Sequence, residues 1–332
     1  MIFSCIQKYF NKIRQYNCLF LFILKKGDSM KKVLIGLLLI ITIPYLIVSS
    51  SVDEEIKFYY VSNKFVRVKR DSTEEIISVP FEEYIKGVLA GEMPISFHKE
   101  ALKAQAVAAR SYVLKKMETS KEKEYDVVDT VMNQVYLDEE TLKERWKEKY
   151  IENNNKLKEV IIETKGEYLT YDNQIVEAFF FSTSTGKTEN SGEVFMTQLP
   201  YLTSVDSTWD EEVSPVFNDS VEYSVSDFCT KLNIPYKENI TIEILKTTST
   251  GRIKNLKINN KEFSANEVVN ALKLRSTYFN IKQINSNIII NTKGYGHGVG
   301  LSQYGALAMA KKGYSYEEIL KHYYQGVEIS KL

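Results

Sequence analysis

A forced break between two helices is the feature that most constrains how this chain can fold. The sequence GEMP, residues 91–94, follows a short apolar segment over 78–89 that is expected to be helical. Pro94 must end that helix, because proline lacks an amide hydrogen and disfavours helical geometry in the residue before it. Residues 96–117 are rich in alanine, with apolar residues at helical spacing. The sequence therefore predicts two consecutive helices, with Glu92 at their junction.

The position of Glu92 suggests a chemical role. A carboxylate at the C-terminal end of a helix faces the negative end of the helix dipole, which favours the protonated form. Apolar neighbours such as Leu89 and Met93 would exclude water and act in the same direction. A carboxyl group that stays protonated near neutral pH can serve as a general acid. Most glutamates near helix ends are solvated, so this context alone does not make Glu92 catalytic.

Composition excludes several classes of site. The 332 residues suffice for one large or two modest domains, and the formal net charge of zero gives no reason to expect nucleic-acid binding. Beyond residue 52 the only cysteine is Cys229, which rules out an intrachain disulfide and a cysteine-based zinc site there. The three histidines, His98, His297 and His322, do not have the spacing of metal ligands. We expect no metal and no cofactor.

The N-terminal part of the chain has the pattern of a membrane anchor. Lys31 and Lys32 precede an apolar run over 33–48, which reaches the roughly 20 residues of a spanning helix if neutral residues to Val52 are included. A cleaved secretory signal is the alternative. Because basic flanks stay in the cytoplasm, the rest of the chain would lie outside it. Residues 1–29 are expected to be an upstream extension, with translation starting at Met30, which N-terminal sequencing would check.

The remaining pattern mixes helices with short strands. A membrane-proximal region, 53–76, contains two expected strands, and residues 77–332 form the main domain. Asp172 and Asn173 form a hairpin turn, and Ser264 begins a helix with a capping box. The expected elements are strands 58–61 and 65–70, a helix 141–164, a hairpin of strands 167–171 and 174–181, and, within an insertion over about 213–288, a helix 225–232 and strands 240–245 and 253–258.

Together these elements predict an α+β fold. Mixed helices and an antiparallel sheet would form a cleft, with a small inserted α/β subdomain, after an N-terminal transmembrane helix.

Two polar segments are candidates for binding. Residues 182–190 follow the apolar strand with hydroxyl side chains and a glycine, and a plain turn is the alternative to a binding loop there. The glycine segment, residues 294–300, has glycine at every second position, so another surface can approach its backbone closely. His297 and Tyr295 would project from the opposite face, and Ser302 can cap the helix that follows.

Four blocks, in order, resemble the catalytic domain of the stage II sporulation protein D family, which also occurs in amidase-enhancer proteins of bacterial cell walls. The blocks are residues 91–112, 180–190, 274–277 and 296–305, and the resemblance covers about 77–329. It implies a lytic transglycosylase that cleaves the β-1,4 bond from N-acetylmuramic acid to N-acetylglucosamine during engulfment in sporulation and leaves a 1,6-anhydro end. The alternatives are a non-catalytic wall-binding module that stimulates an amidase, and a hydrolytic muramidase.

The resemblance also implies roles, partners and a location. Glu92 would be the catalytic acid and base. The partners would be glycan strands, a sporulation amidase and a membrane scaffold, with the ectodomain of a single-pass protein of the mother-cell membrane facing the intermembrane space. Substrate binding is expected of Gln105, Arg110, Ser182, Ser184, His297, Ser302, Gln303 and Tyr304. For three of these, Gln105, Arg110 and His297, the alternative is a structural role in packing or in binding the backbone.

Two departures from the family pattern limit this transfer. Thr185 stands where relatives usually carry glycine, so the loop after residue 181 is expected to be stiffer. Some relatives bind zinc near the segment that matches residues 126–136, but this segment contains no cysteine or histidine here. Zinc is therefore not transferred.

Overall fold

The computed structural model describes residues 35–36, 38–43, 55–56 and 63–332. The chain divides into two units, residues 1–55 and 56–332. In the first unit, residues 38–43 are helical. None of the helices among the described residues has the length and hydropathy needed to cross a bilayer. Most of the anchor predicted over 30–52 lies outside the described residues, as do the extension 1–29 and the strand predicted over 58–61.

The second unit begins with a hairpin and the two predicted helices. Strands β1 (Phe65–Lys69) and β2 (Ile76–Pro80) are antiparallel, and β3 (Val127–Val128) pairs parallel to β1. Helix α3 (Phe81–Glu92) starts after Pro80, so residues 76–80, where the sequence suggested the helix start, are a strand instead. Helix α4 (Lys99–Thr119) starts three residues later than predicted, because His98 is the N-cap and accepts a hydrogen bond from the Glu100 amide.

The charged helix predicted over 141–164 is broken. Helix α5 (Glu139–Trp146) is capped by Asp138, a short 3₁₀ turn η1 (Lys147–Lys149) follows, and α6 (Tyr150–Glu163) continues. Lys147 has a φ of 47°, a left-handed conformation that ends the first helix. The prediction of one continuous helix was therefore wrong, because its periodicity does not reveal a turn of this kind.

The hairpin around residue 172 forms as predicted at its turn. Strands β4 (Glu167–Tyr171) and β5 (Gln174–Ile175) pair antiparallel, and Asp172 and Asn173 both have positive φ. The second strand does not continue to residue 181, however. Strand β6 (Phe180–Phe181) pairs instead, in parallel, with β13 (Leu301–Ser302), which joins the polar loop to the end of the glycine segment.

Residues 218–293 build two small antiparallel sheets with their own hydrophobic core. The helices α9 (Val225–Lys231) and α10 (Ala265–Leu272) and the capping box at Ser264 match the sequence pattern. The core is formed by residues between Val225 and Ile290. The sheets have the orders β11-β12-β7 and β10-β9-β8, from strands β7 (Asn218–Ser224), β8 (Ile242–Thr247), β9 (Ile253–Ile258), β10 (Lys261–Ser264), β11 (Phe279–Ile284) and β12 (Asn287–Lys293).

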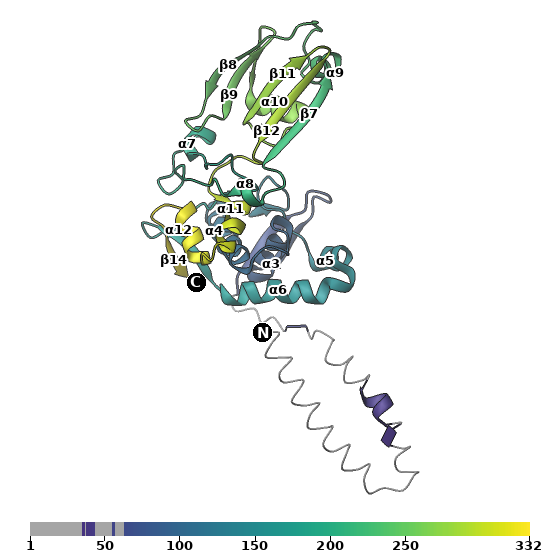
Figure 1. Ribbon diagram of the computed structural model, residues 1–332. Helices are drawn as coiled ribbons and strands as arrows, with labels where there is room; N and C mark the ends of the chain where they lie inside the picture. The colour runs from purple at the N-terminus through teal and green to yellow at the C-terminus, as the bar shows by residue number, and fades with distance from the viewer. Residues whose placement is uncertain (1–34, 37, 44–54, 57–62) are drawn as a thin grey trace. The chain divides into compact units, whose positions relative to one another are not determined.

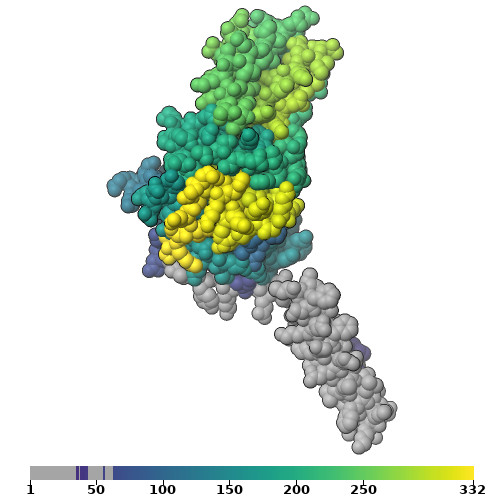
Figure 2. Space-filling model, turned by 60° about the vertical axis from the view of Figure 1, so that its left-hand side comes forward, coloured from purple at the N-terminus to yellow at the C-terminus, as the bar shows by residue number. Residues whose placement is uncertain are grey.

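Helix α4 is the centre of the larger core. It contacts α3, α6, β4 and the two C-terminal helices α11 (Gln303–Lys311) and α12 (Tyr316–Tyr323), as Figure 1 shows. Strand β14 (Glu328–Lys331) pairs with β4. Figure 2 shows the C-terminal residues, in yellow, at the surface next to the teal-green residues around α8 (Asp210–Val213), which α11 contacts. Mixed helices and mainly antiparallel sheets confirm the α+β class.

Candidate active site

Glu92 is the last residue of α3, and its side chain is half-buried. Met93 is extended, with a φ of −121° and a ψ of 139°, and its amide donates to the Leu89 carbonyl. Both Leu89 and Met93 are buried. The predicted helix junction therefore places the Glu92 carboxylate close in sequence to two buried apolar residues, Leu89 and Met93.

A loop from a distant part of the chain supplies the first partner of this carboxylate. The Val135 amide donates a hydrogen bond of 2.7 Å to Glu92 Oε1. The loop can come this close because Gly91 has no side chain: a Cβ there would lie 2.4 Å from the Val135 carbonyl oxygen. Gln134 fixes the loop, since its side chain accepts from the Tyr84 hydroxyl and donates to the Ala109 carbonyl. Gly91 lies inside α3 and is needed for this close packing.

The second partner comes from the C-terminal block. The Gln303 side chain hydrogen-bonds the Glu92 carboxylate, and its Nε2 lies 3.5 Å from Gln105 Oε1. Gln105 is fully buried, and its Nε2 has no partner among the described residues. The ring of Tyr304, the next residue, meets the edge of Phe97 at 5.1 Å between centroids. The structure therefore brings together three of the predicted site residues, Glu92, Gln105 and Gln303, whereas the Tyr304 ring packs against Phe97.

Burial dominates the electrostatics of Glu92. Loss of solvent raises the pKa of this carboxyl above its ordinary value, and the hydrogen bonds from Val135 and Gln303 oppose the rise only in part. The predicted direction of the shift is confirmed. A carboxyl group with a raised pKa and two nearby donors can give up a proton and then hold the resulting charge.

The glycine segment is not the flat extended strand that the sequence suggested. Its four glycines all have φ between 74° and 99°, which L-residues rarely adopt. Close approach adds to this need at Gly300, where a Cβ would lie 2.1 Å from the Phe179 carbonyl oxygen. Close approach to the neighbouring backbone was predicted and is confirmed, whereas the extended backbone expected for the segment was wrong.

His297 is surrounded by aromatic rings and backbone. Its ring lies 5.5–6.1 Å, between centroids, from those of Phe179, Phe181 and Phe195. Nδ1 accepts a hydrogen bond from the Val299 amide, and the ring also bonds the Phe180 backbone. Burial, together with the charge of Arg252, lowers the pKa of His297 to about 4. The imidazole is therefore neutral near pH 7 and is held by the protein itself.

The predicted serines lie around a buried aspartate that the sequence analysis did not select. Asp210 Oδ1 accepts from the Ser184 amide at 2.7 Å and from the Ser302 hydroxyl, and Oδ2 accepts from the Ser207 hydroxyl at 2.6 Å. Burial raises the pKa of Asp210. The carbonyl of Ser182 accepts from the Tyr304 amide at 3.0 Å. Ser184 and Ser302 therefore tie the polar loop to the start of α11.

Arg110 is also engaged inside the protein. Its side chain is fully buried, and Nε and Nη2 donate to the two oxygens of Glu82 at 3.2 and 2.9 Å. Nη1 donates to the Glu167 carbonyl at 2.8 Å. This arrangement joins α3, α4 and β4, which is the packing role that the sequence left open as the alternative to substrate binding.

No sequence motif marks Val135 or Asp210, because each acts through tertiary contacts with residues far along the chain. The single signal for Val135 is indirect: glycines at 87 and 91, one helical turn apart, mark the face of α3 against which the loop packs. Among residues 63–332 and the shorter described stretches before them, no group of three His, Cys, Asp or Glu side chains is arranged to hold a metal ion.

The chain is similar to several known proteins. The family model described as SpoIID, stage II sporulation protein, matches residues 69–171, and one described as a domain of unknown function, DUF8618, matches 202–300. Stage II sporulation protein D of Bacillus amyloliquefaciens is 42% identical over 80% of this chain and 78% of the relative, and that of Bacillus subtilis is 38% identical over the same shares. An amidase enhancer of Bacillus subtilis is 31% identical over 74% of this chain and 40% of its own length.

This chain covers 78% of the length of two relatives that are 42% and 38% identical to it. The resemblance found in the four sequence blocks is therefore confirmed. The matched range 69–171 contains Glu92 and the loop residue Val135 that binds it. This chain belongs to the stage II sporulation protein D family.

Proposed function

We propose that this chain is a peptidoglycan lytic transglycosylase that cuts the N-acetylmuramic acid to N-acetylglucosamine bond of glycan strands during engulfment. The observation that carries the proposal is the setting of Glu92: a half-buried carboxyl whose pKa is raised by burial and whose partners are an amide and the Gln303 side chain. Among the described residues, no second carboxylate contributes to this shift. Hydrolytic glycosidases usually need two carboxylates, whereas attack by the sugar's own C6 hydroxyl needs a single acid and base group.

The reaction proceeds through a single proton relay. Protonated Glu92 gives its proton to the glycosidic oxygen as the bond from that oxygen to C1 of the muramic acid breaks. The C6 hydroxyl of the same sugar then attacks C1, and the Glu92 carboxylate takes the hydroxyl proton. The products are a free hydroxyl on the departing sugar and a 1,6-anhydro ring, and no water is consumed. Because the nucleophile belongs to the substrate, proximity replaces a water-activating base.

Gln303 has a defined part in this scheme. Its side-chain amide stabilises the carboxylate that forms once the proton has left, as does the Val135 amide. Gln105 keeps the Gln303 amide in place through its Oε1. Gln303 and Gln105 thus stabilise the ionised form of Glu92, whereas burial stabilises its protonated form.

The test is direct. Full-length protein is incubated with glycan strands from which the peptides have been removed, and the products are analysed by mass spectrometry, with Glu92→Gln as the matched isosteric control. We expect anhydro ends from the wild type and none from Glu92→Gln in a protein that remains folded. Reducing ends would indicate a hydrolytic muramidase, and unchanged cleavage by Glu92→Gln would refute the role of Glu92.

A wall-binding module that stimulates an amidase is the second candidate, because a relative named amidase enhancer shares 31% identity with this chain. The same incubation separates the two. Binding to strands without any cleavage, together with faster amidase turnover when this protein is added, would favour the module.

The location and partners are also proposals. We infer that the unit 56–332 lies outside the cytoplasm, between the mother-cell and forespore membranes, behind an anchor over 30–52. A sporulation amidase and a membrane scaffold would be its partners. Protease added outside intact protoplasts should digest the unit, and purified amidase should be retained by immobilised full-length protein. Protection from protease would contradict the location.

A further inference from the structure

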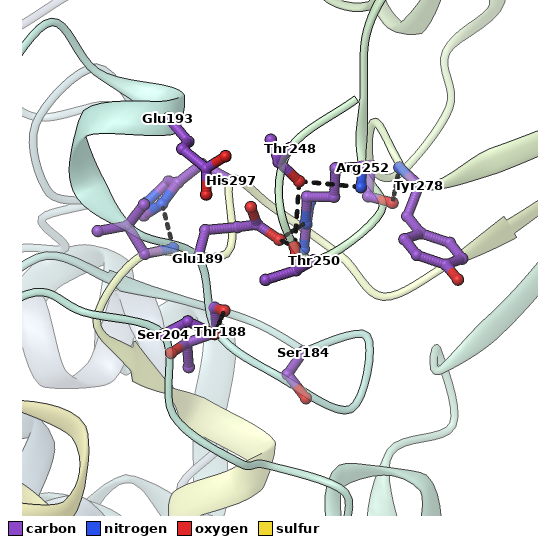
Figure 3. Close-up of polar contacts among 12 residues, drawn as sticks. Ser184, Thr188, Glu189, Glu193, Ser204, Thr248, Thr250, Arg252, Tyr278 and His297 are labelled. Atoms are coloured by element: carbon purple, nitrogen blue, oxygen red, sulfur yellow. Dashed lines mark hydrogen bonds and ion pairs between the residues drawn. The ribbon is translucent and has the colours of Figure 1, made fainter. Parts of the chain in front are cut away.

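A turn of the inserted unit is docked beside the glycine segment. Residues 248–252 connect β8 to β9, and this 248–252 turn contacts the start of the short helix α7 (Ser191–Val194), as Figure 3 shows. The Ser249 amide donates to Glu193 Oε1 at 2.8 Å, and the Thr250 hydroxyl donates to Glu189 Oε1. The contact is therefore made through specific polar groups.

An ion pair lies at the centre of this contact. Arg252 Nε is 3.3 Å from Glu189 Oε1, and the two side chains are only 1% and 0% exposed. Arg252 Nη1 also donates to the Gly296 carbonyl at 2.8 Å, and the Glu189 amide donates to the Gly298 carbonyl at 2.7 Å. Each partner therefore donates one hydrogen bond to the glycine segment, Arg252 through its guanidinium to Gly296 and Glu189 through its backbone amide to Gly298. Figure 3 shows Arg252 beside Glu189.

The ion pair leaves no room for a side chain at residue 298. A Cβ at Gly298 would lie 2.8 Å from both Arg252 Nη2 and Glu189 Cγ. Arg252 Nη2 itself has no hydrogen-bond partner among the described residues. A buried ion pair with an unused donor is a weak source of stability, because desolvation offsets much of the attraction. Fixing the position of a segment is a better-supported role for such a pair.

The position of the glycine segment determines where Gln303 lies. The Phe179 carbonyl accepts from the Leu301 amide at 3.1 Å and lies against Gly300, and β13 then pairs with β6. Gln303 is the next residue and begins α11. Only four residues lie between Gly298 and Gln303, so a shift of the segment is expected to move the side chain that binds Glu92.

We propose that Arg252 and Glu189 are positioning residues, through which the inserted unit holds Gln303 against the catalytic carboxyl. The inference rests on the role proposed for Glu92. It gives the inserted unit a part in the reaction, although neither Arg252 nor Glu189 touches the reacting atoms. The effect on Glu92 passes entirely through Gln303.

The groups around Glu92 determine how its pKa should respond when the ion pair is changed. Val135 and Gln303 donate to Glu92, and its charge also acts on the buried phenol of Tyr84, on the same helix. The Gln303 hydrogen bond lowers the pKa of Glu92 against the larger effect of burial. Weakening that bond should therefore raise the pKa of Glu92 further.

The test uses full-length protein labelled with ¹³C at the glutamate carboxyls, with the Glu92 signal assigned from Glu92→Gln. One variant, Glu189→Gln with Arg252→Met, replaces the pair by neutral side chains of similar size. A second, Arg252→Lys, keeps the charge but loses the second donor that reaches Gly296. Lys282→Ala, which removes an exposed positive charge from the same unit, is the matched control.

We expect the pKa of Glu92 to rise in both pair variants and in Gln303→Leu, and to stay at its wild-type value in Lys282→Ala. Combining a pair variant with Gln303→Leu should add no further rise. In cleavage assays, kcat should fall by about 10- to 100-fold with KM little changed. An unchanged Glu92 titration in both folded pair variants would overturn the proposal.

The same titration separates two kinds of failure. If wild-type protein cleaves no glycan but the pair variants still raise the pKa of Glu92, the positioning is correct and the proposed reaction is wrong. The other case is that the wild type cleaves glycan while a pair variant raises the pKa of Glu92 as much in the Gln303→Leu protein as in the wild type. In that case the coupling does not pass through Gln303, and this inference fails while the proposed function stands.

Discussion

Replacing Arg110 by methionine tests whether this arginine serves the fold or the substrate. In the structure its guanidinium is fully buried and is shared between Glu82 and the Glu167 carbonyl. Glu82 is itself 7% exposed at its side chain and also accepts from the Gly166 amide. Arg110→Met would leave a buried carboxylate without its counter-charge.

The expected loss follows from that geometry. Removing one partner of a buried, hydrogen-bonded ion pair destabilises a protein by about 3–5 kcal/mol. The unpaired Glu167 carbonyl adds about 1 kcal/mol. At roughly 2–4 °C for each kcal/mol in a unit of this size, the melting temperature should fall by at least about 6 °C.

Two variants make the measurement specific. Glu82→Gln combined with Arg110→Met removes both charges and keeps an acceptor for Gly166, so most of the lost stability should return. Lys312→Ala breaks an exposed pair with Glu212, in which the side chains are 44% and 59% exposed, and should change the free energy of unfolding by no more than about 1 kcal/mol.

The assay is urea unfolding followed by tryptophan fluorescence, with glycan cleavage measured on the same preparations below the transition. The reasoning would be refuted if Arg110→Met kept the wild-type midpoint while KM for glycan strands rose. That result would return Arg110 to the substrate-binding role implied by the family resemblance.

Three further predictions concern the glycine segment and the site. Gly300→Ala should destabilise the protein by about 2–5 kcal/mol, whereas Gly313→Ala, with positive φ but nothing within 4 Å, should lose only about 1–2 kcal/mol in the same urea assay. The His297 ring, with a pKa of about 4, should show no NMR titration between about pH 5.5 and about pH 8. Glu92→Gln should be more stable than wild type at neutral pH, and the difference in melting temperature should disappear below the unfolded-state pKa of glutamate; a constant difference would contradict this.

The sign of the Glu92→Gln prediction follows from linkage. Burial gives the folded protein a higher carboxyl pKa than the unfolded chain, so folding favours the protonated form. Stability from this group is therefore fully present at low pH and is lost as pH rises through the unfolded and then the folded pKa. Glutamine cannot ionise and escapes that loss.

The parts of the fold that depend on local chemistry could be predicted from the sequence. The capping box at Ser264, the turn at Asp172 and Asn173, and the helix end at Glu92 all form where their residues indicate. Each of these signals is complete within four or five neighbouring residues, so distant packing does not alter it.

The contacts that complete the site could not be predicted in this way. Val135 lies 43 residues from Glu92 and contributes its amide, which every non-proline residue possesses, so its side chain carries no signal. Asp210 is the first residue of the short helix α8 and has no motif around it, and its three hydroxyl and amide donors come from separate segments. The parallel pairing of β6 with β13 decides which of these residues meet, and strand pairing between short segments is not encoded by periodicity.

The acid strength of Glu92 is consequently a property of the tertiary structure. The helix end and its apolar neighbours set the upward direction of the pKa, and this part was visible in the sequence. The opposing hydrogen bonds come from the 129–137 loop and from the start of α11, which the glycine segment and its buried ion pair hold in place. Because the effect of burial exceeds that of the two hydrogen bonds, the pKa of the carboxyl is raised, and in the proposed reaction the same two donors would stabilise the charge once the proton has left.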